Sequence, residues 1–131
     1  MWPFRRRKQP GLGSRGEELA ERFLKRHGLK ILARNYRCPV GEADLVALDS
    51  STESTSGLET IAFVEVKTRS SSRHTDPASA VNSEKMKRLR RVAQYYLANR
   101  QVDDFNIRFD VVAVVLSEGQ DPQVEHIPDA F

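Results

Sequence analysis

The sequence predicts an α/β fold in which helices cover a central mixed β-sheet. The length of 131 residues is that of one domain. Two segments have the hydrophobic periodicity of helices, and four have the alternating, β-branched pattern of strands. Their order along the chain is α-β-β-β-α-β, so we expect the first three strands to form a meander.

The first helix is expected over residues 15–27. Ser14 and Glu17 have the S-x-x-E spacing of a capping box, and Gly28 supplies a stop signal. Between them, apolar residues recur at helical spacing: Leu19, Ala20, Phe23 and Leu24. Residues 1–13 are basic, contain proline and glycine and show no periodicity. We therefore predict a flexible basic arm over 1–13 and a single domain over 14–131.

Strands are expected at about 29–37, 40–48 and 59–68, with a Ser/Thr-rich loop at 49–58. A polar stretch then leads through Pro77 to the second helix, expected at about 83–100. The strongly apolar segment at about 106–116 predicts a fourth strand, followed by a short tail. Within this strand we expect Asp110 to make a structural pair with Arg108. Cys38 is expected to be a small, largely buried thiol.

The net charge of +3 conceals four zones of alternating sign. Residues 1–38 carry +8, residues 39–68 carry −5, residues 69–100 carry +6 and residues 101–131 carry −6. A chain that alternates basic and carboxylate-rich zones is suited to handling an anion and a cation together. This pattern points to a polyanion held beside a metal ion.

Several classes of protein are excluded by composition. No apolar run approaches the roughly 18–20 residues of a membrane span, and the N-terminus lacks the apolar core of a secretory signal, so we expect a cytoplasmic protein with no membrane partner. One cysteine excludes an internal disulfide, and three scattered histidines lack zinc-ligand spacing. Any metal would be a hard cation such as Mg²⁺ or Mn²⁺, held by carboxylates.

Two predicted strands carry charges where a small core should have none. Asp44 lies mid-strand, and alternation places Glu65 and Lys67 on the same face of the later strand, about 7 Å apart. One interpretation is a phosphodiesterase site, in which Asp44 and Glu65 bind the metal with the Val66 backbone carbonyl as a third ligand, and Lys67 orients water or stabilises developing charge. The alternative is a Glu65–Lys67 or Asp44–Lys67 ion pair that only sets the strand register.

Two further carboxylates have open roles. Glu17 is explained equally well by the capping box or by a position facing the sheet, where it could reach the metal. Glu42 lies on the face of Asp44 and is either a supporting group or a solvated strand end.

The second helix predicts an anion-binding surface. Its apolar stripe consists of Met86, Leu89, Val92, Ala93, Tyr96 and Leu97. The opposite side carries Lys87, Arg88, Arg90 and Arg91, whose like charges repel unless an anion binds. Gln94 and Tyr95 fall on this side, where Tyr95 either stacks on an unpaired base or is an ordinary surface aromatic.

Five segments together carry a resemblance to a known family. They are Gly16-Glu17, Gly41-Glu42-Ala43-Asp44-Leu45, Phe63-Val64-Glu65-Val66-Lys67-Thr68-Arg69, Pro77-Ala78 with Ala80-Val81, and Arg108-Phe109-Asp110-Val111-Val112. Over about residues 14–116 the chain resembles the bacterial YraN family of predicted endonucleases, which is similar to the PD-(D/E)XK nucleases and especially to their Holliday-junction-resolvase-like branch. Ala43 and the long 49–58 loop depart from the usual pattern.

This resemblance implies a restriction-endonuclease-like three-layer fold with a central mixed β-sheet. It implies Glu17, Asp44, Glu65 and Lys67 as the active-site set, with Glu17 at a second metal. The residues we assign to nucleic-acid contact are Arg69, Lys87, Arg88, Arg90, Arg91, Gln94 and Tyr95.

The expected function is a Mg²⁺- or Mn²⁺-dependent DNA endonuclease, with branched or flapped DNA as a candidate substrate. A non-catalytic nucleic-acid-binding or adaptor protein is the alternative, and an RNA-directed nuclease is a third. Many junction-cutting enzymes act as symmetric dimers, so a homodimer is a further option that no sequence feature selects.

Overall fold

The computed structural model describes residues 12–70, 82–100 and 104–131. Its sheet has five strands in the order β1-β2-β3-β4-β5: Lys30–Cys38, Gly41–Asp49, Thr60–Arg69, Asn106–Val115 and Gln123–Ile127. The first three strands pair antiparallel in succession, β3 and β4 are parallel, and β5 returns antiparallel to β4. The predicted meander and mixed sheet are confirmed.

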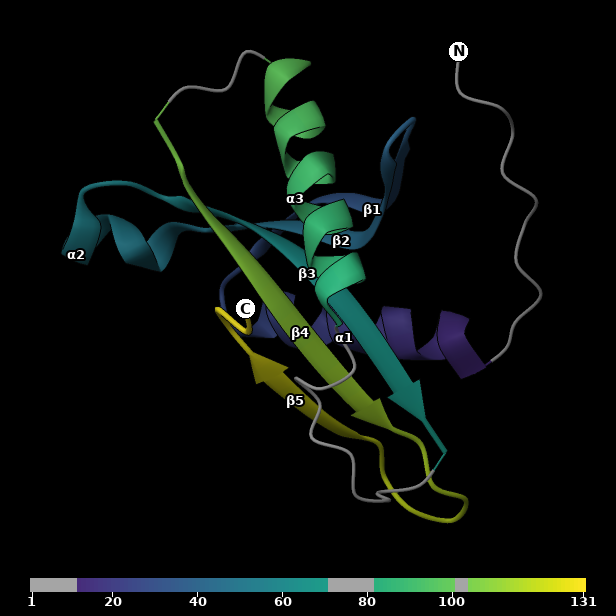
Figure 1. Cartoon of the computed structure of the whole chain (residues 1–131). Helices are drawn as coiled ribbons and strands as arrows, with labels where there is room; N and C mark the ends of the chain where they lie inside the picture. Colours follow the sequence, from purple (N-terminus) through teal and green to yellow (C-terminus); the bar gives the residue numbers. More distant parts are fainter. Residues whose placement is uncertain (1–11, 71–81, 101–103) are drawn as a thin grey trace.

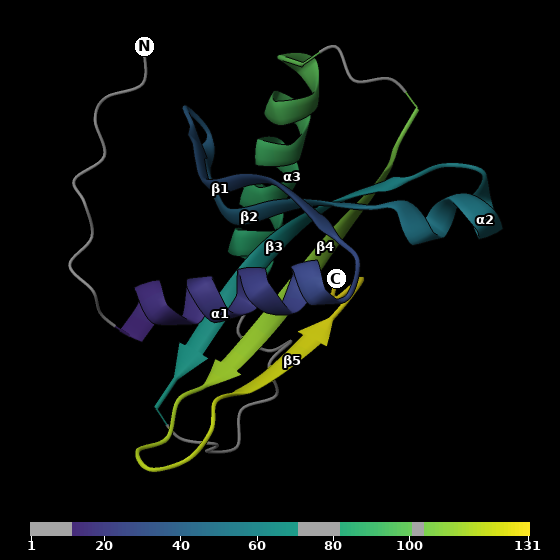
Figure 2. The ribbon, with the colours of Figure 1, turned by 180° about the vertical axis from the view of Figure 1, so that it is seen from behind.

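Two long helices cover opposite faces of this sheet, α1 (Leu12–Arg26) and α3 (Ser83–Ala98). Figure 1 shows α3 in front of the strands, and Figure 2 shows α1 on the other side. Each helix has its own apolar core, because alternate residues of a strand point to opposite faces. The α1 core includes Leu24, Leu45 and Val64, and the α3 core includes Phe63 and Val92. The predicted three-layer α/β arrangement is confirmed.

Helix α1 begins three residues before its predicted start. Ser14 is therefore the third residue of the helix and not its N-cap, and the predicted capping box is wrong. The predicted stop is correct, since Gly28 has a φ of 90° and the N–H of Leu29 donates to the carbonyl of Leu24 at 3.0 Å. Most of the predicted basic arm, residues 1–11, lies outside the described residues.

The Ser/Thr-rich segment predicted as a loop contains two short helical turns, η1 (Ser50–Thr52) and α2 (Glu53–Ser56). Hydroxyls stabilise these turns by donating to backbone carbonyls one turn earlier. Ser54 donates to the carbonyl of Ser51 and Thr55 to that of Thr52, both at 3.1 Å. Figure 1 shows this segment projecting from one end of the sheet.

The segment predicted as a tail contains a fifth strand, β5, which a buried ionic network attaches to β4. Asp110 is fully buried and accepts hydrogen bonds from Arg108 Nε at 2.8 Å, His126 Nε2 at 2.8 Å and the Asp129 backbone N–H at 3.0 Å. Burial alone would raise the pKa of Asp110, but the bonds from His126 and Arg108 outweigh it and lower the pKa. The predicted Asp110–Arg108 pair is confirmed, and Cys38 is buried as expected.

No helix in the described parts of the chain is both long and apolar enough to span a membrane.

A close approach of α1 to β3 sets the height of the helix above the sheet. A Cβ added to Gly16 would lie 1.8 Å from Thr68 Oγ1 and 2.9 Å from Thr68 Cβ, so no rotation of the Thr68 side chain removes the clash. Glycine at this position therefore allows the helix to contact the strand directly, and the neighbouring Glu17 is held close to the sheet.

We predict that Gly16→Ala lowers the free energy of unfolding by about 1–3 kcal/mol, because the helix must move away from Thr68. Gly13→Ala is the matched control, since a Cβ there meets nothing within 4 Å. Because alanine favours the helix, that change should stabilise the protein by up to about 1 kcal/mol. Urea denaturation followed by circular dichroism distinguishes the two, and equal effects would contradict the proposed contact.

Candidate functional site

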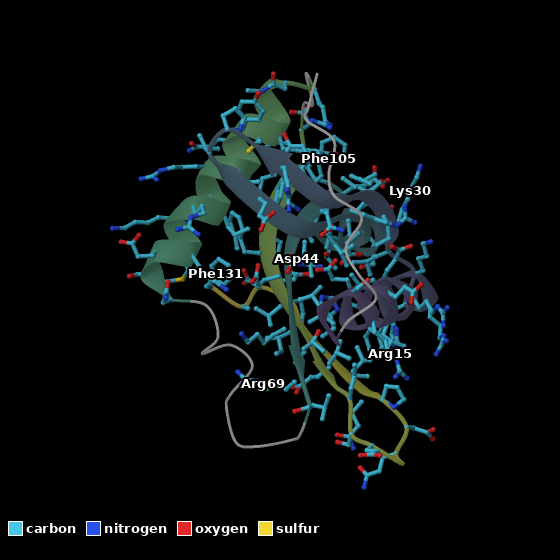
Figure 3. The ribbon with its side chains drawn as sticks, turned by 90° about the vertical axis from the view of Figure 1, so that its right-hand side faces the viewer. Arg15, Lys30, Asp44, Arg69, Phe105 and Phe131 are labelled. Carbon is cyan, nitrogen blue, oxygen red and sulfur yellow. The ribbon has the colours of Figure 1, made fainter. Side chains whose placement is uncertain are left out.

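The candidate site lies where β2 and β3 separate. Their backbone pairing runs from Asp49↔Thr60 to Leu45↔Val64. Just beyond the last pair, the backbone N–H of Val66 donates to Asp44 Oδ2 at 2.8 Å. The Asp44 side chain thus takes over where the backbone pairing of the two strands ends, and Asp44 is fixed against β3. Figure 3 shows Asp44 near the middle of the molecule, between α3 and α1.

Asp44 and Glu65 share a cavity of about 120 Å³ on the α3 side of the sheet. Its lining residues are Glu42, Asp44, Glu65, Lys85, Arg88 and Leu89. Acidic groups come from β2 and β3, and basic groups come from α3. The prediction that adjacent strands bring Asp44 and Glu65 together on one face is consistent with this geometry.

The electrostatics of Asp44 reveal an excess of negative charge. Burial, together with the charges of Glu65, Glu17 and Glu42, raises the pKa of Asp44 to about 7, although the hydrogen bond from the Val66 N–H lowers it. A nearby cation would stabilise the ionised form of such a carboxylate. The donor set therefore fits a hard divalent cation, which prefers carboxylate oxygens.

Glu65 pairs with Lys85 of α3, and not with Lys67 as the structural alternative required. Lys85 Nζ lies 3.1 Å from Glu65 Oε1. Lys67 is half-buried and follows Glu65 by two residues on β3, so strand alternation places it on the same face. Among the described residues Lys67 makes no hydrogen bond or ion pair. The alternative of a register-setting ion pair through Lys67 is therefore wrong.

Glu17 and Glu42 flank the site from different sides. Glu17 of α1 is half-buried, and its charge reaches Asp44, yet it lines a separate cavity of about 390 Å³ with Ser14 and Glu21. Glu42 is 60% exposed and pairs with Arg37 at 3.0 Å, although it also lines the cavity of Asp44. Glu42 therefore lies at a solvated strand end that borders the cavity.

The predicted basic face of α3 is exposed. Lys87, Arg88, Arg90, Arg91 and Gln94 are all on the surface, while Tyr95 is half-buried and packs against the α3 core. Arg88 alone of these four basic residues lines the cavity, and it crosses the start of β2 where Gly41 leaves room: a Cβ there would lie 2.8 Å from Arg88 Cγ. Arg69 ends β3 and is half-buried, about 13 Å along the strand from Glu65.

Lys85 is the site residue that the sequence analysis missed. A signal was available, because Lys85 precedes the buried Leu89 by four residues and so lies on the sheet-facing side of α3. The sequence analysis assigned no role to Lys85. Helical position, which separates Lys85 from Lys87, is the observation that identifies it.

Among the described residues, no group of three or more His, Cys, Asp or Glu side chains is arranged to hold a metal ion. The structure brings together two carboxylates, Asp44 and Glu65, with two cationic side chains of α3. It thus defines an α/β protein with an acidic site beneath a basic helix.

This chain belongs to the uncharacterised protein family UPF0102, whose model matches residues 16–114. Relatives named UPF0102 protein include one from Geobacter metallireducens, 48% identical over 92% of this chain and 91% of its own length. Another, from Nocardia farcinica, is 45% identical over 92% of this chain and 88% of its own length. UPF0102 is the YraN family, so the membership expected from the sequence is confirmed.

We predict that Asp44→Asn stabilises the protein at pH 8, measured in a chelating buffer. The raised pKa means that ionised Asp44 destabilises the fold, with a penalty that grows from about pH 4 and is complete above about pH 7. Asparagine removes the charge and keeps an oxygen for the Val66 N–H. The expected gain is about 1–3 kcal/mol at pH 8 and little at pH 4.

Glu42→Gln is the control for this change, since it removes an exposed carboxylate two residues away on the same strand. It should alter stability by less than about 0.5 kcal/mol at either pH. Chemical denaturation measures the change in the free energy of unfolding of each variant, relative to wild type, at pH 4 and at pH 8. A gain from Asp44→Asn that does not depend on pH would contradict the electrostatic origin.

Proposed function

We propose that this protein is a metal-dependent endonuclease acting on DNA. The observation that carries the proposal is the meeting of Asp44 and Glu65 in one cavity where β2 and β3 separate, beneath the basic helix α3. Lys67 follows Glu65 by two residues on β3 and so lies on the same face of that strand, outside the lining of this cavity. Carboxylates on two strands, with a lysine on the same face, are groups that can support metal-dependent hydrolysis of a phosphodiester.

Asp44 and Glu65 would hold Mg²⁺ or Mn²⁺, with the Val66 backbone carbonyl as a third protein ligand. Two carboxylates suffice, because Mg²⁺ usually takes its remaining ligands from water and substrate phosphate. Such an ion lowers the pKa of a water molecule and offsets negative charge on a phosphate. Glu17, whose charge reaches Asp44, would serve a second ion.

We assign Lys67 as the catalytic lysine. Its ammonium would orient the attacking water or stabilise negative charge developing on the scissile phosphate. Its lack of an ion pair among the described residues supports this role, since no partner there must be released first.

Substrate binding is assigned to the exposed face of α3. Lys87, Arg90 and Arg91 project from the helix whose other basic residues, Lys85 and Arg88, line the cavity. A DNA backbone lying along α3 would therefore place a phosphate near Asp44 and Glu65. Arg69 at the end of β3, exposed Gln94 and the half-buried Tyr95 would add contacts.

The proposal predicts cleavage of DNA only when Mg²⁺ or Mn²⁺ is present. The substrates are branched, flapped, single-stranded and duplex DNA and a matched RNA, and products are resolved on denaturing gels. Asp44→Asn and Lys67→Met should each lower the rate at least about 100-fold, the scale on which electrostatic catalytic groups act. Lys30→Met, an exposed lysine on β1, is the control with equal charge loss and should cleave normally.

Cleavage at equal rates by all four proteins would refute the assigned site. DNA binding without any cleavage would instead identify the non-catalytic binding or adaptor protein. Cleavage confined to the RNA would redirect the substrate class, and size-exclusion chromatography with the preferred substrate would show whether two copies act together.

The binding surface makes a separate prediction. Replacing Lys87, Arg90 and Arg91 with alanine should weaken duplex binding and reduce the slope of log affinity against log salt by up to about 3. Replacing Arg22, Arg26 and Lys30 removes the same charge from exposed positions on α1 and β1 and should change the slope little. Fluorescence anisotropy at several salt concentrations measures both slopes, and equal slopes would show that α3 is merely solvated.

A further inference from the structure

We propose that Lys85 is a built-in counter-ion of the site: it neutralises Glu65 until a divalent cation binds, and is then released to contact a DNA phosphate. This inference rests on the proposed function and assigns a regulatory role to a residue outside the expected active-site set. Its basis is the ion pair between α3 and β3 inside the cavity that also contains Asp44.

The geometry makes Lys85 and a metal ion competitors. Lys85 Nζ lies 3.1 Å from Glu65 Oε1, and the Glu65 side chain is only 18% exposed. A divalent cation coordinated by Glu65 would lie within a few ångströms of this ammonium, where two positive charges repel strongly in a partly buried site. Metal binding at Glu65 therefore requires Lys85 to move away.

Lys85 can move without disturbing the helix. Its backbone N–H is fixed by the Asn82 side chain, which accepts it at 3.0 Å and caps α3. Its side chain is 38% exposed, and four flexible methylene groups connect the ammonium to this fixed backbone. The charge can thus leave Glu65 while the Cα stays in place.

The released ammonium has a suitable destination. Lys85 lies in the first turn of α3, where the helix dipole favours an anion, and Arg88 lines the same cavity one turn later. A phosphate entering the cavity would meet both side chains. Binding of the metal then strengthens binding of DNA, because the metal releases Lys85 to contact a DNA phosphate. By thermodynamic linkage, DNA strengthens metal binding to the same degree.

The first test measures Mn²⁺ binding alone by isothermal titration calorimetry. Lys85→Met should bind Mn²⁺ at least about threefold more tightly than wild type, because the competitor is absent. Lys87→Met loses the same charge from the solvent-facing side of α3 and controls for long-range electrostatics. Glu65→Gln should bind Mn²⁺ more weakly than wild type and shows that the titrated site is the proposed one.

Equal affinities of Lys85→Met and Lys87→Met, together with weaker binding by Glu65→Gln, would overturn the counter-ion role and leave the metal site intact. Absence of Mn²⁺ binding by the wild type would overturn the proposed function and this inference with it. The two failures are therefore distinguishable without measuring activity.

The second test measures how much a divalent cation strengthens DNA binding. Anisotropy of a labelled duplex is recorded in Ca²⁺ and in chelator, with the intact substrate verified on a gel. The Ca²⁺-induced gain in affinity should shrink in Lys85→Met and persist in Lys30→Met, which removes an exposed lysine of β1. An undiminished gain in Lys85→Met would show that the released lysine does not reach the phosphate.

Discussion

The hydrogen bond from the Val66 N–H to Asp44 is the contact on which the site depends. It lies where the β2–β3 pairing ends, so it fixes the position of Asp44 beyond the last backbone pair. Without it, a half-buried carboxylate facing Glu65 would have no compensating donor, and its charge would drive the strands apart. The geometry of the fold and the chemistry of the site are therefore set at one point.

The fold brings together charged residues that lie in different zones of the sequence. The basic residues of α3 and the carboxylates of β2 and β3 meet on one face, whereas Glu17 approaches from α1 on the other face. The acidic zone at the C-terminal end also has a structural role, because buried Asp110 links β4 to His126 and Asp129. The two acidic zones and the basic residues of α3 thus have distinct places around the same sheet.

The hydrophobic periodicity of the sequence correctly predicted the helices and strands in which that periodicity is strong. Helix α3 and strands β1 to β4 lie within two residues of their predicted bounds, since each buries one or both faces. Strand β5 was missed because exposed Gln123 and Glu125 mask a short run with few apolar residues. The start of α1 was misplaced because Ser14 and Glu17 mimic a cap while lying inside the helix.

The sequence by itself determined the α/β class, the order of the elements and the candidate roles of Asp44, Glu65 and Lys67, because periodicity and misplaced charges are local properties. Only the tertiary structure decided that Glu65 pairs with Lys85 and that Glu17 acts on Asp44 from a separate cavity. Those relations join residues twenty or more positions apart. They depend on how α1 and α3 pack against the sheet, through contacts such as that of Gly16 with Thr68, which no pattern along the chain records.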